Sequence, residues 1–284
     1  TKVDKDYPDN KLTGAKFTVY AIDGMTEVGK LTEVTAGEYQ LNDLPYGDYL
    51  LRETKSPENY VLDSNLYAFS IREAGKTVTV ETNAGKGFEN NAITGSISIS
   101  KHSADGVLSG WQFRVTGTAI TGQKYDKTFT TDAKGTIIIS NLRIGDYKVI
   151  EVKTDKTVGY ITEDSKDIEV QPDTITTVNF ENKPYGNIVI NKVDAKTGEK
   201  VTGATFGIYT DSACKTAAKA YTSDTDDALI NAVIAETEDG KYTCNFLPIS
   251  SEAGTVYYIK ELTAPEGYYL DKNTYAVVLK TANA

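Results

Sequence analysis

The sequence repeats itself three times, and no other feature limits the possible folds as strongly. One repeated phrase places Gly two residues after an aliphatic residue and then alternates apolar and polar residues, which is typical of a half-buried strand. It occurs at Leu12–Tyr20, Leu108–Thr116 and Val201–Tyr209. A second phrase, with the pattern strand, tight turn, strand, starts at a Gly in each copy. The period of roughly 90–100 residues is that of a small independent domain rather than of a solenoid repeat.

The repeats predict an all-β chain of three tandem β-sandwich domains. Short strands with turn signals recur along the whole sequence, and no long segment has a helical period. Domain boundaries are expected just after the Phe-Glu-Asn sequence that ends the first two copies, which gives domains at 1–92, 93–184 and 185–284. Because the linkers hold only a few residues, we expect an elongated, semi-rigid rod.

The composition excludes several classes of partner. The chain has 30 Lys and Arg residues against 40 Asp and Glu residues, a net charge of −10. Such an acidic surface repels phosphate, so we expect no binding to nucleic acid or to anionic lipid. No stretch approaches about 18 apolar residues, so direct membrane insertion is not expected either. The chain opens at Thr1 without a basic and apolar leader, so any signal peptide is expected to have been removed or never to have been part of this sequence.

The residues needed for common enzyme sites are scarce. His102 is the single histidine, which excludes a histidine zinc cluster and argues against a Ser-His-Asp triad. We expect it to be a solvent-facing strand residue, and we predict no cofactor and no metal ion. The Asp-rich segment Asp4–Asn10 is interpreted as a solvated turn, because it lacks the closing Glu and the fixed Gly of a Ca²⁺ loop. Cys214 and Cys244 allow two interpretations, a pair of buried apolar thiols or one local disulfide.

A triplet of polar residues recurs at matched positions and carries the chemical signal. The first strand of each copy holds a lysine, namely Lys2, Lys101 and Lys192. A glutamate lies late in each central hairpin, namely Glu53, Glu151 and Glu261. The closing strand of two copies holds an asparagine, namely Asn90 and Asn182. Each residue alone would be interpreted as a solvated side chain, but Ile97, Ile99 and Lys101 alternate in phase, so this lysine is predicted to point inward.

These phrases resemble one known family. The combination of Lys-Val-Asp, Thr-Gly-Ala-x-Phe, a Pro-Glu-x-Tyr turn and Phe-Glu-Asn resembles Cna-B (SpaA-type, prealbumin-like) domains of Gram-positive pilins and adhesins. The resemblance covers nearly the whole chain and is weaker in the second copy, where Trp111 replaces the Ala. It implies an immunoglobulin-like or prealbumin-like sandwich for each copy.

The resemblance also implies self-formed Lys–Asn isopeptide bonds, which the residue chemistry supports. Burial lowers the pKa of a lysine and raises that of a glutamate, which favours a neutral amine beside a carboxylic acid. The amine attacks the Asn carboxamide, the Glu donates a hydrogen bond to the carboxamide oxygen and relays protons, and ammonia leaves. We predict a Lys2–Asn90 bond assisted by Glu53 and a Lys101–Asn182 bond assisted by Glu151. This is one turnover per domain, so the chain is not expected to be an enzyme.

The third copy departs from the pattern. The spacing seen in the first two copies would place its asparagine 31 to 37 residues after Glu261, beyond Ala284. Lys192 and Glu261 are therefore expected to have no partner here, since Asn283 fits the spacing poorly. A continuing chain or a strand from another chain are the two ways to complete this domain.

The expected function is structural: a stalk or shaft segment of a pilin or adhesin on the extracellular, cell-wall-anchored surface of a Gram-positive bacterium. Its expected partners are other modules of the same surface protein or pilus. Two alternatives stay open: an adhesin module that binds a host matrix protein or glycan, and an accessory β-module of a secreted enzyme.

Overall fold

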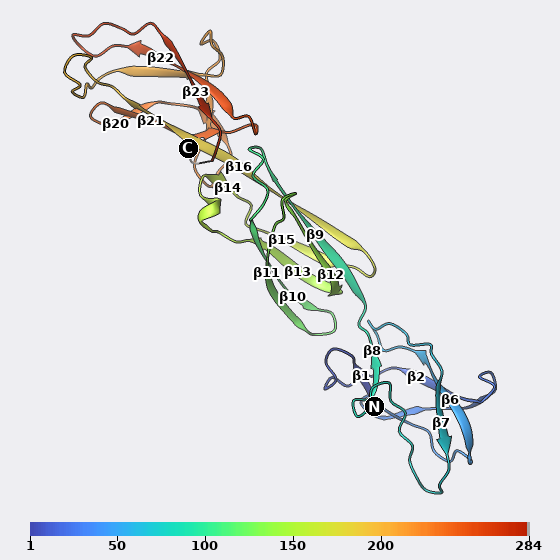
Figure 1. Ribbon diagram of the computed structural model, residues 1–284. Helices are drawn as coiled ribbons and strands as arrows, with labels where there is room; N and C mark the ends of the chain where they lie inside the picture. Colours follow the sequence, from blue (N-terminus) through green and yellow to red (C-terminus); the bar gives the residue numbers. More distant parts are fainter. Residues whose placement is uncertain (283–284) are drawn as a thin grey trace.

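The chain folds into three β-rich modules arranged in a row. A computed structural model describes residues 1–282 and shows the modules following one another along an elongated rod (Figure 1). We use the predicted ranges 1–92, 93–184 and 185–284 to name modules 1, 2 and 3. Within the described residues the helical structure is a single 3-10 turn, η1 (Asp155–Thr157), so the predicted all-β architecture of tandem sandwiches is confirmed. No helix in that range is long and apolar enough to cross a membrane.

Each module is built from short strands, and β16 runs from module 2 into module 3. Module 1 contains β1 (Lys2–Asp4), β2 (Lys16–Ala21), β3 (Glu27–Lys30), β4 (Thr32–Thr35), β5 (Glu38–Gln40), β6 (Gly47–Lys55), β7 (Tyr67–Ile71) and β8 (Phe88–Asn90). Module 2 contains β9 (Thr94–Ser103), β10 (Gln112–Ala119), β11 (Lys124–Thr130), β12 (Thr136–Arg143), β13 (Gly145–Glu151), β14 (Tyr160–Ile161), β15 (Ser165–Val170) and the start of β16 (Ile175–Asn191). Module 3 continues with β17 (Thr205–Tyr209), β18 (Lys219–Tyr221), β19 (Leu229–Asn231), β20 (Ala235–Glu238), β21 (Lys241–Pro248), β22 (Thr255–Thr263) and β23 (Thr274–Leu279).

Module 2 shows the sandwich in its most complete form. One sheet has the order β11-β10-β13-β15, and the other contains β12, β9 and β16. Alternate residues of both sheets point inward, as the sequence alternation predicts, and meet in an apolar core. Ile97, Ile99, Phe113 and Phe180 lie in this core and are fully buried.

The first and last strands of modules 1 and 2 lie side by side and run parallel. In module 1, β1 pairs with β8 so that Lys2 lies opposite Phe88 and Asp4 opposite Asn90. In module 2, β9 pairs with β16 in the same way, with Lys101 opposite Phe180. In modules 1 and 2, the lysine on the first strand therefore lies beside the closing strand, two positions before the asparagine.

A glycine sets the position of each of these lysines. The backbone N–H groups of Lys2, Lys101 and Lys192 donate to the carbonyl oxygens of Gly37, Gly135 and Gly240 at 2.7, 2.8 and 2.7 Å. These glycines have φ of 71°, 76° and 66°, in the left-handed region that favours Gly. At Gly135 and Gly240 a Cβ atom would lie only 2.7 and 2.8 Å from the lysine's own carbonyl oxygen. The glycine that opens the second repeated phrase thus allows the hairpin to close against the lysine strand.

Modules 2 and 3 share a continuous strand, whereas modules 1 and 2 are joined by a short segment between two strands. β16 is 17 residues long, and its first part closes module 2 while its second part pairs with β21 in module 3. Between modules 1 and 2, residues 91–93 are held by hydrogen bonds from Val61 N–H to the Asn91 carbonyl (2.8 Å) and from Ile93 N–H to the Asn59 carbonyl (2.9 Å). These connections account for the rod seen in Figure 1.

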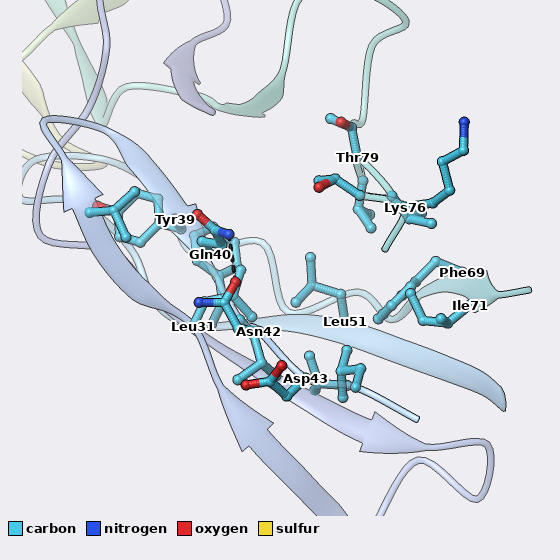
Figure 2. A pocket seen from close by; sticks show the side chains of 18 of the residues that line it. Leu31, Tyr39, Gln40, Asn42, Asp43, Leu51, Phe69, Ile71, Lys76 and Thr79 are labelled. Carbon is cyan, nitrogen blue, oxygen red and sulfur yellow. Dashed lines mark hydrogen bonds between the residues drawn. The ribbon is translucent and has the colours of Figure 1, made fainter. Parts of the chain in front are cut away.

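Module 1 contains an open groove of about 850 Å³ between residues 38–46 and 73–80. Figure 2 shows Leu51, Phe69 and Ile71 lining it on the sheet side. In module 2, Ile97 and Ile99 of β9 are fully buried between the sheets.

The two cysteines are not joined, which corrects the disulfide alternative. Cys244 is buried in the core of module 3, whereas Cys214 is half-buried in a turn with φ of 54°. The Cys214 Sγ faces Thr274 Oγ1 at 3.7 Å. The other interpretation, two buried thiols, holds for Cys244 but not for Cys214. Burial raises the pKa of the Cys244 thiol to about 11.

Candidate functional site

The structure brings all three members of the triplet together in module 1. Lys2 comes from β1, Glu53 from the end of β6 and Asn90 from β8, and their exposed fractions are 0%, 0% and 2%. Lys2 Nζ contacts Asn90 Oδ1 and lies 3.4 Å from Glu53 Oε1. Asn90 Nδ2 donates to both Glu53 oxygens, at 2.8 and 3.1 Å. The amine, the carboxamide and the carboxyl group therefore form one closed contact cluster away from water.

Aromatic and backbone groups hold this cluster in place. Lys2 Nζ lies 4.7 Å from the centre of the Phe88 ring and donates to the Phe88 carbonyl at 3.1 Å. The second oxygen of Glu53 accepts a hydrogen bond of 2.9 Å from the backbone of Asp63. Burial lowers the pKa of Lys2 to about 8, although the nearby Glu53 carboxylate opposes this shift. A neutral amine, the form that can attack a carboxamide, is thus accessible near neutral pH.

The position of the carboxyl group differs from the sequence-based mechanism. That mechanism has Glu53 donate a hydrogen bond to the carboxamide oxygen of Asn90. In the structure Glu53 faces Nδ2, the nitrogen that would leave as ammonia, and the oxygen faces Lys2. In this arrangement the carboxyl group is placed to exchange protons with the amine and the leaving nitrogen, and contact with the oxygen requires a half-turn of the carboxamide.

Module 2 buries the same triplet but joins only two of its members. Asn182 Nδ2 donates to Glu151 Oε1 at 2.8 Å, while Asn182 Oδ1 and Glu151 Oε2 are buried without a hydrogen-bond partner. Lys101 Nζ instead donates to the His102 carbonyl at 2.9 Å and lies 4.5 Å from the centre of the Trp111 ring. Modules 1 and 3 have Ala at the position of Trp111. The larger Trp111 ring gives the Lys101 amine a cation–π contact that those modules cannot provide at this position.

The electrostatics of module 2 match those of module 1 even though the amine is turned away. Burial lowers the pKa of Lys101 to about 8, and burial raises the pKa of Glu151 above its usual value. Both shifts favour the uncharged forms, a free amine and a carboxylic acid. The proposed bond would require a different rotamer of Lys101, with its amine turned from the His102 carbonyl towards the Oδ1 side of Asn182, the part of the carboxamide that has no hydrogen-bond partner.

Module 3 contains the lysine and the glutamate without an asparagine from the described residues. Lys192 Nζ lies 2.9 Å from Glu261 Oε1. The Lys192 side chain is 22% exposed, in contrast to its buried counterparts, while Glu261 is buried. Glu261 Oε2 accepts a hydrogen bond from the Asp271 backbone at 2.7 Å, as Glu53 does from Asp63. Asn283 lies outside the described residues.

The structure also shows a polar contact that the sequence interpretation missed. Asp4 was expected in a solvated turn, but it is fully buried and accepts hydrogen bonds of 2.6 and 2.8 Å from Arg143 of module 2. Tyr60 Oη donates to it at 2.8 Å. The sequence did contain a signal of this burial. Asp4 lies two residues after Lys2, so on a strand it points to the same side as that inward lysine.

The remaining predicted polar residues carry no site. His102 is exposed, with Nε2 3.1 Å from Ser100 Oγ. Among residues 1–282, no three His, Cys, Asp or Glu side chains are arranged to hold a metal ion.

Comparisons with known proteins agree with the repeat. The family model of the SpaA prealbumin-like fold domain matches residues 1–86, 95–184 and 186–284. No curated protein sequence matches the chain. Among solved structures, the Bacillus anthracis TIE protein is similar over 100% of this chain at 22% identity, with a TM-score of 0.54. The chain covers 48% of that protein, so it spans about half its length, and the likeness shows the fold alone.

Two pilin structures also match over most of their length. The Streptococcal ancillary pilin has 17% identity and a TM-score of 0.33, and BcpA, the major pilin subunit of Bacillus cereus, has 18% identity and a TM-score of 0.33. In both cases the match covers 98% of this chain and 93% of the other. Since the family model matches each of the three modules in turn, the chain belongs to the SpaA family of prealbumin-like fold domains.

Proposed function

We propose that the chain is a stalk segment of a Gram-positive cell-surface protein, of the pilin or adhesin kind, whose modules cross-link themselves with Lys–Asn isopeptide bonds. The observation that carries this proposal is the module 1 cluster, in which Lys2, Asn90 and Glu53 are in contact and buried. A buried amine and carboxamide side by side are costly for folding and have one simple reaction available to them.

The reaction is an amide exchange. The neutral amine of Lys2 attacks Cγ of Asn90, a new C–N bond forms, and the bond from Cγ to Nδ2 breaks. Glu53 passes a proton from the attacking amine to the leaving nitrogen, which departs as ammonia. Folding holds the reactants in contact, which replaces a bimolecular encounter. Each module consumes its own side chains in a single turnover, so the chain is not an enzyme in the ordinary sense.

The position of the bond suits a stalk. It joins the first strand of a module to the last, so a force along the rod passes through the bond and not through the strands between. The bond in module 1 would also close a loop of 88 residues. By analogy with a disulfide of similar loop length, the lost entropy of the unfolded chain stabilises the module by roughly 4–5 kcal/mol.

Partners and location follow from the same proposal. The exposed ends of the rod would meet other modules of the same surface protein or pilus, outside the cell. The acidic surface, with a net charge of −10, keeps densely arranged copies apart.

Intact mass spectrometry of the purified chain tests the proposal. We expect a mass lower than that of the sequence by two ammonia molecules, one each from modules 1 and 2. Glu53→Ala should restore one ammonia and Glu151→Ala the other, because each removes the proton relay of one module only.

Glu89→Ala is the matched control, since Glu89 lies between Phe88 and Asn90 and bonds to Asn83 instead of to the cluster. It should leave both losses intact. An unmodified mass in the wild-type chain, with circular dichroism showing a folded β protein, would overturn the proposal.

A further inference from the structure

A short turn between β6 and β7 holds the carboxyl group of Glu53. Asp63 Oδ1 accepts hydrogen bonds from the Asn65 backbone N–H at 3.1 Å and from the Asn65 side chain at 2.7 Å. Tyr67 Oη donates to the other oxygen of Asp63. These contacts fix the backbone N–H of Asp63, which donates to Glu53 Oε2 at 2.9 Å. The Asp63 side chain therefore shapes the turn, and the Asp63 backbone contacts the carboxyl group.

Tyr67 connects this turn to the amine side of the cluster. Its ring packs edge-on against Phe88, with the two ring centres 4.9 Å apart. The centre of the Phe88 ring in turn lies 4.7 Å from Lys2 Nζ. The hydroxyl group of one tyrosine thus supports the turn that holds the carboxyl group, while its ring supports the aromatic side chain beside the amine.

Module 3 repeats the turn around its own glutamate. Asp271 Oδ1 accepts from the Asn273 backbone at 2.9 Å, and Tyr275 Oη donates to Asp271 Oδ2 at 2.6 Å. The backbone N–H of Asp271 donates to Glu261 Oε2 at 2.7 Å. Both modules share the pattern Asp-x-Asn-x-Tyr and differ at the two intervening residues. The pattern itself therefore builds the contact with the glutamate.

Module 2 lacks the pattern, and its glutamate lacks the contact. Lys166 pairs with the residue two positions before the glutamate, which is the register position of Tyr67 in module 1. Glu163 lies three residues before Lys166 and accepts from the Glu181 backbone at 2.9 Å. Within residues 1–282, Glu151 Oε2 is buried without a hydrogen-bond partner. The missing turn thus coincides with a carboxyl oxygen that nothing holds.

We propose that Asp63 and Tyr67 are positioning residues for amide formation in module 1, because their turn orients the Glu53 carboxyl group towards the amine and the leaving nitrogen. This inference rests on the isopeptide reaction proposed above. A carboxyl group that relays a proton must stay within hydrogen-bond reach of both nitrogens. The hydrogen bond to Oε2 restricts rotation of the Glu53 side chain, since turning away would break it. Without the turn, fewer molecules hold the carboxyl group in place.

The rate of ammonia loss in newly made chains tests this role. The full chain is synthesised in a cell-free system, quenched in acid at intervals and mapped by peptide mass spectrometry, which reports on modules 1 and 2 separately. Asp63→Ala removes the acceptor that shapes the turn. It should slow the loss from module 1 about tenfold, the ratio that corresponds to one hydrogen bond to a charged group. Module 2 of the same molecules should keep its wild-type rate.

Two conservative variants separate positioning from a general loss of stability. Asp63→Asn keeps an acceptor for the Asn65 N–H and should restore the wild-type rate. Tyr67→Phe keeps the ring against Phe88 and removes only the hydroxyl group, so it should slow the loss less than Asp63→Ala does. If Asp63→Ala does not fold, this variant still tests the role. A wild-type rate in Tyr67→Phe together with an Asp63→Asn rate as slow as that of Asp63→Ala would overturn the inference.

Asp23→Ala is the matched control. Asp23 Oδ1 accepts from the backbone of Met25 and Thr26 at 2.8 and 2.9 Å, in a turn of the same kind between β2 and β3. The substitution breaks a comparable turn of module 1 that does not contact Glu53, and it should leave the rate of ammonia loss unchanged. Equal slowing by Asp23→Ala and Asp63→Ala would trace the effect to folding and overturn the positioning role.

The same time courses distinguish this inference from the proposed function. If wild-type module 1 loses ammonia and folded Asp63→Ala loses it at the same rate, the positioning role fails and the proposed function stands. If the folded wild-type chain keeps its ammonia in both modules, the proposed function fails and the positioning role fails with it.

Discussion

The amines of Lys2 and Lys101 lie away from water at 0% and 1% exposure, and this governs their reactivity. Burial lowers both pKa values from 10.5 to about 8. A surface lysine at neutral pH is almost entirely charged and inert towards amides, whereas these amines are partly neutral. Burial also raises the pKa of Glu151, which favours its protonated form beside Asn182. The folded environment therefore favours the uncharged forms of amine and carboxyl group that the proposed reaction needs.

The rate of amide formation should depend on pH in a defined way. Below about pH 8 the neutral fraction of Lys2 rises about tenfold per pH unit, so the rate should rise equally and then level off. The stability of module 1 before the bond forms should also rise with pH. Between about pH 8 and 10.5 Lys2 keeps its proton in the unfolded chain but has lost it in the folded module, so the free energy of unfolding increases through this window.

Refolding the chain at a series of pH values and timing the loss of ammonia by mass spectrometry gives the rate. Lys2 and Lys101 should show the same midpoint, with module 2 slower because Lys101 starts turned towards Trp111. A rate that is flat from about pH 6 to about pH 9 would contradict burial as the cause of reactivity.

At the level of strands, the parallel pairs β1–β8 and β9–β16 decide where force travels. If the bond joins Lys2 to Asn90, a pull on the rod bypasses the 87 residues between them. Stretching single molecules should then give no extension from module 1. Glu53→Gln, which keeps the shape of the side chain, should release roughly 300 Å on unfolding, at about 3.4 Å per residue.

Glu89→Ala again serves as the control and should extend no further than the wild type. An equal release of length from wild type and Glu53→Gln would mean that no covalent link spans β1 and β8.

The strands and the triplet were predictable because their signals are local or repeated. The alternation of Ile97, Ile99 and Lys101 predicts an inward lysine, and repetition predicts its partners. The rotation of Lys101 towards Trp111 was not predictable, since it depends on how one ring fills the space left by an alanine. The buried role of Asp4 was missed for a different reason: its partner Arg143 lies 139 residues away, in another module, and no local pattern records such a contact.

Across the whole molecule, the two junctions are built differently. Modules 2 and 3 share the continuous strand β16, and Ile249 N–H donates to the Pro184 carbonyl at 2.9 Å. Between modules 1 and 2 the strand is interrupted, and Arg143 bridges the gap to Asp4 and Asp6. Burial raises the pKa of Asp4, yet hydrogen bonds from Arg143 and Tyr60 outweigh it and hold that pKa below its usual value.

Arg143→Ala should therefore loosen the rod at one junction. The substitution leaves Asp4 buried without its cation, which should lower the free energy of unfolding by about 3 kcal/mol. Small-angle X-ray scattering should show a broader distribution of end-to-end lengths, while the junction between modules 2 and 3 stays unchanged. Arg114→Ala is the matched control, because Arg114 pairs with Asp126 at the surface with both side chains about half exposed, and it should cost under about 1 kcal/mol.

The difference between the variants should vanish in acid, since the contribution of Asp4 is present above its unfolded pKa and is lost as pH falls through its lower folded value. Equal effects of the two substitutions at neutral pH would show that the rod owes its stiffness at this junction to the backbone hydrogen bonds of residues 91–93 alone.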